Sequence, residues 1–122
     1  MRLNPFSKPT PTKGTAIRDM TWEQILQHRL DSYSDDERGQ ISMRALNFET
    51  CALGEQLTLR GYQIEQGCGL DVKAVDPTLH VMALRFYALI GACNGKGARK
   101  LQQDIAARMT DAKCAQIAEV LL

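Results

Sequence analysis

The chain has no hydrophobic run that approaches the roughly 20 residues needed to span a bilayer. Its first 14 residues are basic but contain no apolar segment, so they do not predict a secretory signal. Neither sign of charge dominates, because the 122 residues carry a net charge of +1. No general attraction to nucleic acid or to an anionic membrane is therefore expected. These absences predict a cytoplasmic protein with no membrane partner.

Paired motifs for metal binding or redox chemistry are also missing. The four cysteines lie far apart, at Cys51, Cys68, Cys93 and Cys114. In a reducing compartment we expect free thiols that pack as small hydrophobic groups, with Cys68, between two glycines, the most exposed. Both histidines, His28 and His80, lie outside any catalytic or zinc-binding motif. The sequence predicts no enzyme activity, no cofactor and no metal, while a thiol or metal sensor based on Cys68 stays an alternative.

What is present is the composition of one soluble globular domain, with 44% hydrophobic and 24% charged residues. Residues 1–18 hold three of the four prolines and predict a flexible tail, which leaves 19–122 as a single domain. Strand-like alternation of apolar and polar residues is absent from the sequence, whereas helical spacing recurs. The predicted fold class is all-α, with about five helices packed as antiparallel pairs.

Two capping boxes predict where the first helices begin. Thr21 is followed three residues later by Gln24, and Ser34 is followed in the same way by Glu37. The second helix is expected to reach Arg60; Gly39 and Gly54 are its weak points, with a break expected at Gly39 and a close backbone approach at Gly54. Its inward stripe is predicted to contain Met43, Leu46, Thr50, Leu53 and Leu57.

The second half of the chain predicts three more helices after an ambiguous glycine-containing segment, 61–76, with a short helix around 71–75 or a functional loop. Asp76 followed by Pro77 is a strong helix start, because a capping carboxylate precedes a proline at the first helical position. The helix from there to Cys93 is apolar almost all round, so we expect it to be central and the most buried. Further helices are expected over about 97–109 and after Thr110.

A pattern of small and aromatic residues in the last third resembles the second half of a sel-one-like repeat, a relative of the tetratricopeptide repeat. The matching residues are Ala83, Phe86, Tyr87, Gly91 and Ala98. Upstream, Ala52-Leu53-Gly54 resembles the first helix of such a repeat, and the last 22 residues resemble the closing helices. The chain departs from the pattern at Asn94, where the family usually has glycine, and by roughly a dozen extra residues before Ala83. The resemblance covers about 48–122 and implies a role in holding partner proteins without catalytic residues.

Candidate contact residues lie in three places. Lys96, Arg99 and Lys100 begin a helix and form a basic patch that Arg108 and Lys113 are expected to extend. They are interpreted either as a solvated face or as a contact for an acidic partner or a nucleic-acid backbone. An acidic turn and the 61–76 segment offer the other two surfaces. The full candidate set is Asp35, Asp36, Glu37, Tyr62, Cys68, Lys96, Arg99 and Lys100.

The sequence therefore predicts a small helical module that binds another protein. The alternative is a small regulator or inhibitor that acts on nucleic acid or a nucleoprotein complex, as a mobile element might encode; the basic patch and basic tail motivate it. A homodimer fits both functions, because one repeat leaves a helix face uncovered.

Overall fold

The computed structural model describes residues 15–65 and 71–122, and within these ranges the chain is all-helical, as predicted. Three short 3-10 turns precede or separate the α-helices: η1 (Ile17–Asp19), η2 (Leu30–Ser32) and η3 (Val72–Ala74). The α-helices are α1 (Trp22–Leu26), α2 (Asp35–Leu46), α3 (Ala52–Leu59), α4 (Pro77–Gly91), α5 (Gly95–Arg108) and α6 (Asp111–Leu121). Within the described ranges, no helix is both long and apolar enough to cross a bilayer.

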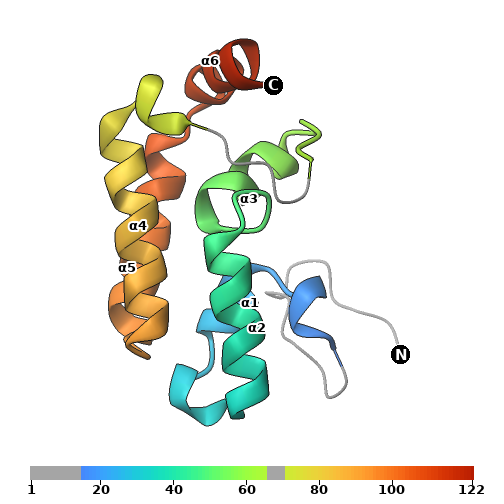
Figure 1. Cartoon of the computed structure of the whole chain (residues 1–122), viewed down its shortest axis with the longest axis vertical. Coiled ribbons are helices and arrows are strands. Elements are labelled where there is room, and N and C mark those ends of the chain that lie inside the picture. The colour runs from blue at the N-terminus through green and yellow to red at the C-terminus, as the bar shows by residue number, and fades with distance from the viewer. Residues whose placement is uncertain (1–14, 66–70) are drawn as a thin grey trace, which may run out of the picture.

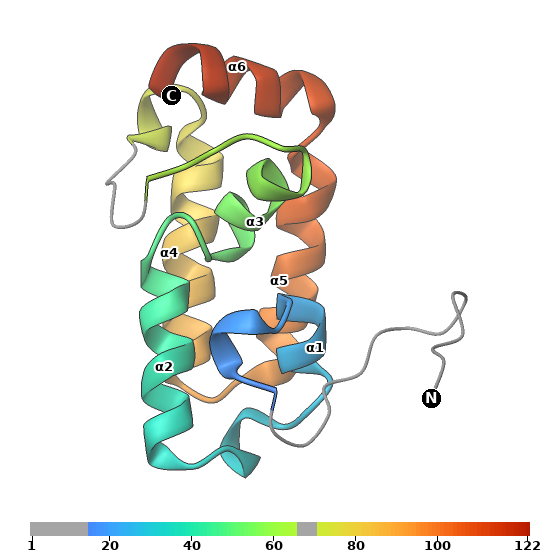
Figure 2. The same ribbon diagram turned by 90° about the vertical axis from the view of Figure 1, so that its right-hand side faces the viewer.

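The helices form two layers and a cap. α4 and α5 run side by side in opposite directions and make one layer (Figure 1). α1, α2 and α3 make the second layer, and α6 lies across the end at which α4 begins and α5 ends (Figure 2). The buried hydrophobic side chains form one cluster between these elements. At its centre the rings of Trp22 and Phe86 meet edge to face, with centroids 4.9 Å apart, and so join the two layers.

Local capping chemistry sets the helix starts as predicted. Both capping boxes are present: Thr21 and Ser34 accept hydrogen bonds from the backbone N–H groups of Gln24 and Glu37, whose side chains accept from the capping residues in return. Asp76 caps α4 ahead of Pro77, and Thr110 caps α6. The short helix expected around 71–75 is the 3-10 turn η3.

The expected helix from Ser34 to Arg60 is wrong, because the chain leaves helical geometry at Asn47 and turns before α3 begins. Two side-chain hydrogen bonds hold the turn. The Thr50 hydroxyl, within the turn, donates to the Arg44 carbonyl, and the Trp22 indole N–H, from α1, donates to the Thr50 carbonyl. Gly39 is not a break, since α2 runs straight through it. Gly54 is a close approach, because a Cβ there would overlap the Phe48 carbonyl.

The inward stripe predicted for this helix is wrong in its first half. Met43 and Leu46 are 66% and 60% exposed, and α2 instead buries Ile41 and Ala45. The predicted stripe assumes one continuous helix. The turn at 47–51 instead separates α2 from α3, so the residues that face inward on α2 do not continue the pattern of α3. Leu53 is buried as expected, because it belongs to α3.

α4 is less buried than its composition predicts. It buries Leu79, Phe86 and Ile90, but Val81 and Leu84 are 59% and 56% exposed. The second layer covers only one side of α4, so an apolar face is left at the surface. The expectation that α4 is the most buried helix is therefore wrong.

The chain enters the core before the first capping box. Ile17 in η1 is buried, and the guanidinium of Arg44 donates to the carbonyls of Ile17 and Met20 at 2.7 and 2.6 Å. The same guanidinium lies over the Trp22 ring, 5.0 Å from its centroid. Arg44 thus fastens η1 to α2. Residues 1–14 of the expected tail lie outside the described residues.

Candidate interaction surfaces

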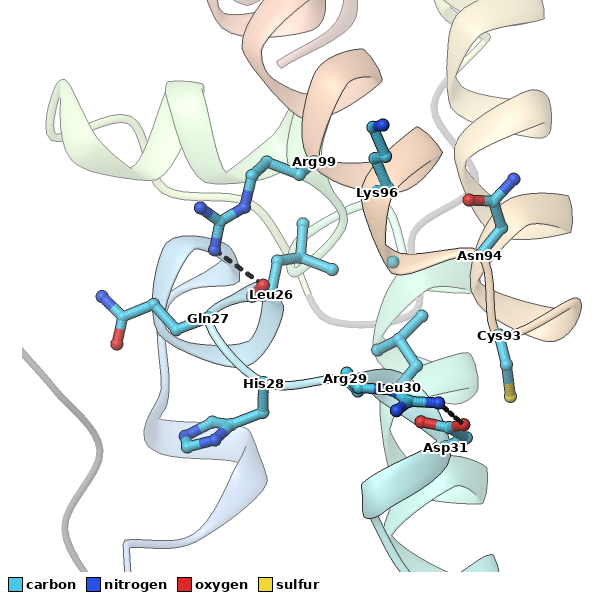
Figure 3. Close-up of a pocket in the computed structure, with 11 residues that line it drawn as sticks. Leu26, Gln27, His28, Arg29, Leu30, Asp31, Cys93, Asn94, Lys96 and Arg99 are labelled. Carbon is cyan, nitrogen blue, oxygen red and sulfur yellow. Dashed lines mark hydrogen bonds and ion pairs between the residues drawn. The ribbon is translucent and has the colours of Figure 1, made fainter.

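A pocket of about 540 Å³ lies beside the turn between α4 and α5. Its walls come from two segments far apart in the sequence, residues 26–31 after α1 and residues 93–96 with Arg99 at the start of α5. Figure 3 shows the two segments side by side, with the Arg99 side chain reaching across to the Leu26 carbonyl. Two of the predicted basic residues, Lys96 and Arg99, therefore line a hollow in the surface.

The α4–α5 turn fixes the direction of this wall. Cys93 adopts a left-handed backbone conformation with φ of 55°, which ends α4 and reverses the chain. Asn94 then caps α5 by accepting a hydrogen bond from the Gly97 N–H at 2.9 Å. The N–H groups of Gly95 and Lys96 precede the first intrahelical bond, and both residues line the pocket. The wall combines these donors with the positive end of the helix dipole.

The three residues of the predicted basic patch differ in the contacts that they make. Lys96 is exposed and forms no ion pair within the described part of the chain. Arg99 donates to the Leu26 carbonyl at 2.7 Å and so ties α5 to the end of α1. Lys100 pairs with Asp104 at 3.0 Å, one turn along the helix. Of the three, Lys96 is the cation available to a partner.

Segment 26–31 brings one further cation to the pocket, Arg29, which the sequence does not single out. His28 and Arg29 are exposed at the pocket, and Arg29 pairs with Asp31 at 2.7 Å across the exposed rim. Surface pairs of this kind contribute about 0–1 kcal/mol, so an incoming carboxylate or phosphate can compete for Arg29. Motif spacing gave no signal for this pairing of segments, because about 65 residues separate Arg29 from Asn94.

Arg108 and Lys113 do not extend the patch, contrary to expectation. Both point at Asp76, which is 3% exposed: Arg108 donates at 2.9 and 3.1 Å, and the Lys113 ammonium lies at 3.2 Å. Asp76 also accepts from the Thr78 and Leu79 N–H groups as the cap of α4. The hydrogen bonds from Arg108, helped by the Leu79 N–H and Lys113, outweigh burial and lower the pKa of Asp76 to about 2. This cluster joins α4, α5 and α6 and is structural.

The predicted acidic residues begin α2. Glu37 belongs to the capping box, Asp35 pairs with Arg38, and Asp36 accepts a hydrogen bond from the Gln40 amide at 2.9 Å. Asp35 and Asp36 also line a second hollow of about 540 Å³ between η1 and α2. Asp35 and Asp36 therefore lie at a different hollow from Lys96 and Arg99.

Of the remaining candidates, Tyr62 lines neither hollow. Tyr62 is half-buried and packs against the core, and its N–H donates to the Leu57 carbonyl at 3.1 Å. Cys68 lies outside the described residues. Of the other cysteines, Cys51 and Cys114 are buried free thiols whose pKa values are raised by burial. Cys93 is half-exposed at the pocket. Among the described residues, no three His, Cys, Asp or Glu side chains are grouped as metal ligands.

Charge is divided between the two layers. Residues 77–110, which contain α4 and α5, carry five basic side chains and one acidic side chain. Residues 15–65, which contain α1, α2 and α3, carry nine acidic and five basic side chains. The near-neutral total charge hides this asymmetry, although a count by segment would have found it in the sequence.

Comparison with known proteins adds no relative. No protein-family model, no curated protein and no solved structure matches the chain. The resemblance to a sel-one-like repeat therefore stays a prediction, and the function is argued from the surfaces themselves.

Proposed function

We propose that the chain is a small, non-enzymatic, cytoplasmic helical module that binds another protein, and that the pocket beside Lys96 receives an acidic segment of that partner. The observation that carries the proposal is that Lys96, Arg29 and the first residues of α5 line one pocket. An acidic segment lying over this pocket has the exposed Lys96 ammonium, the Arg29 guanidinium in its surface pair with Asp31, and the positive end of a 14-residue helix around it. The resemblance to repeats that hold partner proteins supports the same role.

The pocket has the donors for recognition but a poor arrangement for chemistry. Its histidine, His28, is exposed and lies edge to face against Tyr33, with centroids 5.9 Å apart. Its thiol, Cys93, lies 3.8 Å from the Arg38 guanidinium and is not hydrogen-bonded to His28 in the described structure. A base held against a nucleophile, which covalent catalysis requires, is therefore missing from these side chains. Binding is the function that these groups support.

Affinity capture from the native cell tests the proposal. We expect the wild-type chain to recover a protein partner in near-stoichiometric amount and Lys96→Glu to recover at least about tenfold less, because an acidic segment would then meet a like charge. Lys73→Glu is the matched control, since Lys73 is an exposed lysine in η3, far from the pocket. Equal recovery by the wild type and Lys96→Glu would contradict a role for the pocket.

A second candidate function is a small regulator that acts on nucleic acid or a nucleoprotein complex. The observation that favours it is the excess of basic residues over 77–110, five against one. Phosphate contacts by Lys96 and Arg29 would make binding fall steeply with salt. Fluorescence anisotropy with labelled duplex DNA and RNA at two salt concentrations measures this directly. Failure to bind heparin or either duplex at low salt would remove direct binding to nucleic acid.

The homodimer expected from the sequence belongs to the same proposal. Self-association and binding at the pocket are separable, because the exposed face of α4 and the pocket share no lining residues.

A further inference from the structure

The exposed face of α4 is apolar along most of its length. Val81, Leu84 and Ala88 follow one another at spacings of three and four residues and are all exposed. Arg85 is the exposed charge beside them, and it forms no ion pair with any described residue. A helix of 15 residues is about 22 Å long, so this face is long enough to receive another helix.

α2 carries an exposed face whose first turn is acidic. Met43 and Leu46 are exposed on it, with Asp36 and Gly39 on the preceding turns. Part of this face is hollowed, because η1 and α2 together enclose the second hollow of about 540 Å³, which Asp36, Gly39 and Met43 help to line, together with Asp35, Arg18 and Arg44. No atom lies within 4 Å of where a Cβ of Gly39 would be, so the floor of the hollow is open at that point.

The two faces complement each other in size. On α4, Leu84 is followed one turn later by the small Ala88; on α2, the absent side chain of Gly39 is followed one turn later by Met43. A large side chain from one face can therefore lie against a small residue of the other, as helix packing requires.

They also complement each other in charge. Arg85 would lie near the acidic start of α2, where Asp36 is exposed and is hydrogen-bonded only to a neutral amide among the described side chains. Pairing α4 with α4 of a second copy would instead bring two Arg85 side chains into one contact, and α4 has no acidic side chain to offset them. Charge thus favours α2 of another copy as the occupant of the α4 face.

We propose that the chain associates with itself head to tail, with the α4 face of one copy seated against the α2 face and hollow of the next. Each copy then presents one face of each kind. Such a contact is heterologous, so it continues to grow or closes into a ring instead of stopping at a two-fold dimer. One helix face on one hollow is small for an interface, so we expect a dissociation constant of about 10 µM to 1 mM.

Two single variants and their mixture test this arrangement. Leu84→Asp blocks the α4 face and leaves α2 intact, whereas Met43→Asp blocks the α2 face and leaves α4 intact. Both side chains are more than half exposed, so the fold should tolerate both changes. Sedimentation velocity between 10 µM and 1 mM, with circular dichroism to confirm folding, gives the result.

The wild type should show an average mass that rises with concentration above the 13.6-kDa chain. Each variant alone should associate at least about tenfold more weakly, because an unpaired carboxylate would enter an apolar contact. The equimolar mixture should form a 1:1 complex of twice the chain mass and no larger species, because it contains one intact pair of faces. A two-fold dimer with reciprocal α4–α2 contacts would give the same mixture, but its wild type would stop at twice the chain mass, whereas the head-to-tail contact predicts a wild-type mass that rises beyond it.

Three results would overturn the proposal. A wild type that stays monomeric at 1 mM removes self-association, and undiminished association of Met43→Asp alone would show pairing through α4 only. Two variants that stay monomeric when mixed would show that the faces do not meet. A charge exchange provides an independent check: Arg85→Glu and Asp36→Arg should each weaken association, and the double variant should recover it at least in part.

Discussion

Replacing Asp76 by asparagine should destabilise the protein by about 2 kcal/mol at neutral pH. Hydrogen bonds from Arg108 are the largest cause that lowers the pKa of Asp76 from 3.8 to about 2, and one pH unit of displacement corresponds to about 1.4 kcal/mol. Asparagine keeps the capping oxygen but loses the charge, so the cost is mainly that of the ion pairs. Arg108 and Lys113 remain partly exposed and can turn to water. Asp76→Ala removes the cap as well and should cost about 1 kcal/mol more.

Urea unfolding followed by circular dichroism measures this difference. The matched control is Asp104→Asn, because Asp104 forms an exposed pair with Lys100 within one helix, which contributes no more than about 0.5 kcal/mol. A loss below about 0.5 kcal/mol for Asp76→Asn, equal to the control, would refute the role assigned to the cluster.

The dependence on pH gives a second readout of the same variant. A depressed pKa means that the stabilising contribution is complete above pH 3.8 and is lost as the pH falls through about 2. The difference in stability between the wild type and Asp76→Asn should therefore be constant near neutral pH and shrink towards zero near pH 2. Other carboxylates titrate in both proteins and largely cancel. A difference that persists unchanged at pH 2 would show that the loss is not one of charge.

Three further predictions concern packing and thiols. Gly54→Ala should lower the free energy of unfolding by more than about 3 kcal/mol or prevent folding, because the new methyl group would overlap the Phe48 carbonyl. Gly39→Ala should instead stabilise α2 by about 0.5–1 kcal/mol, measured by thermal unfolding. Arg44→Met should release η1, because the two carbonyls that Arg44 binds lose their charged donor. We expect faster amide exchange at 17–20 and a free energy of unfolding lower by about 2 kcal/mol. Unchanged exchange would contradict that role. In a Cys68→Ser background, Cys93 should react with a thiol reagent in the native state, while Cys51 and Cys114 should react only after unfolding.

Features decided within one turn of chain were predictable from the sequence. The capping boxes at Thr21 and Ser34 and the carboxylate cap of Asp76 depend on residues two or three positions apart, and all three form. Features decided by distant segments were not. The turn after Leu46 depends on Trp22, whose indole N–H reaches the Thr50 carbonyl from another helix. The local pattern after Ser34 carries no sign of that contact, so it predicts a helix that continues to Arg60.

The same division holds for the surfaces. Lys96 and Arg99 were found from their clustering, but the pocket needs Arg29, which arrives from another layer. The prediction that Arg108 extends the basic patch is wrong because its guanidinium points at Asp76, whose carboxylate is buried between three helices. The exposure of Leu84 could not be read from an apolar helix, because it depends on which side the second layer covers.

Site-specific photo-crosslinking at the pocket tests the central claim most directly. His28 is exposed at the rim, so His28→p-benzoylphenylalanine places a crosslinking group there without removing a core side chain. After irradiation in the native cell, we predict one discrete protein adduct, absent when Lys96→Glu is added and absent when the same group replaces Lys73. No adduct above the Lys73 background, or an adduct that nuclease removes, would contradict binding of a protein at this pocket.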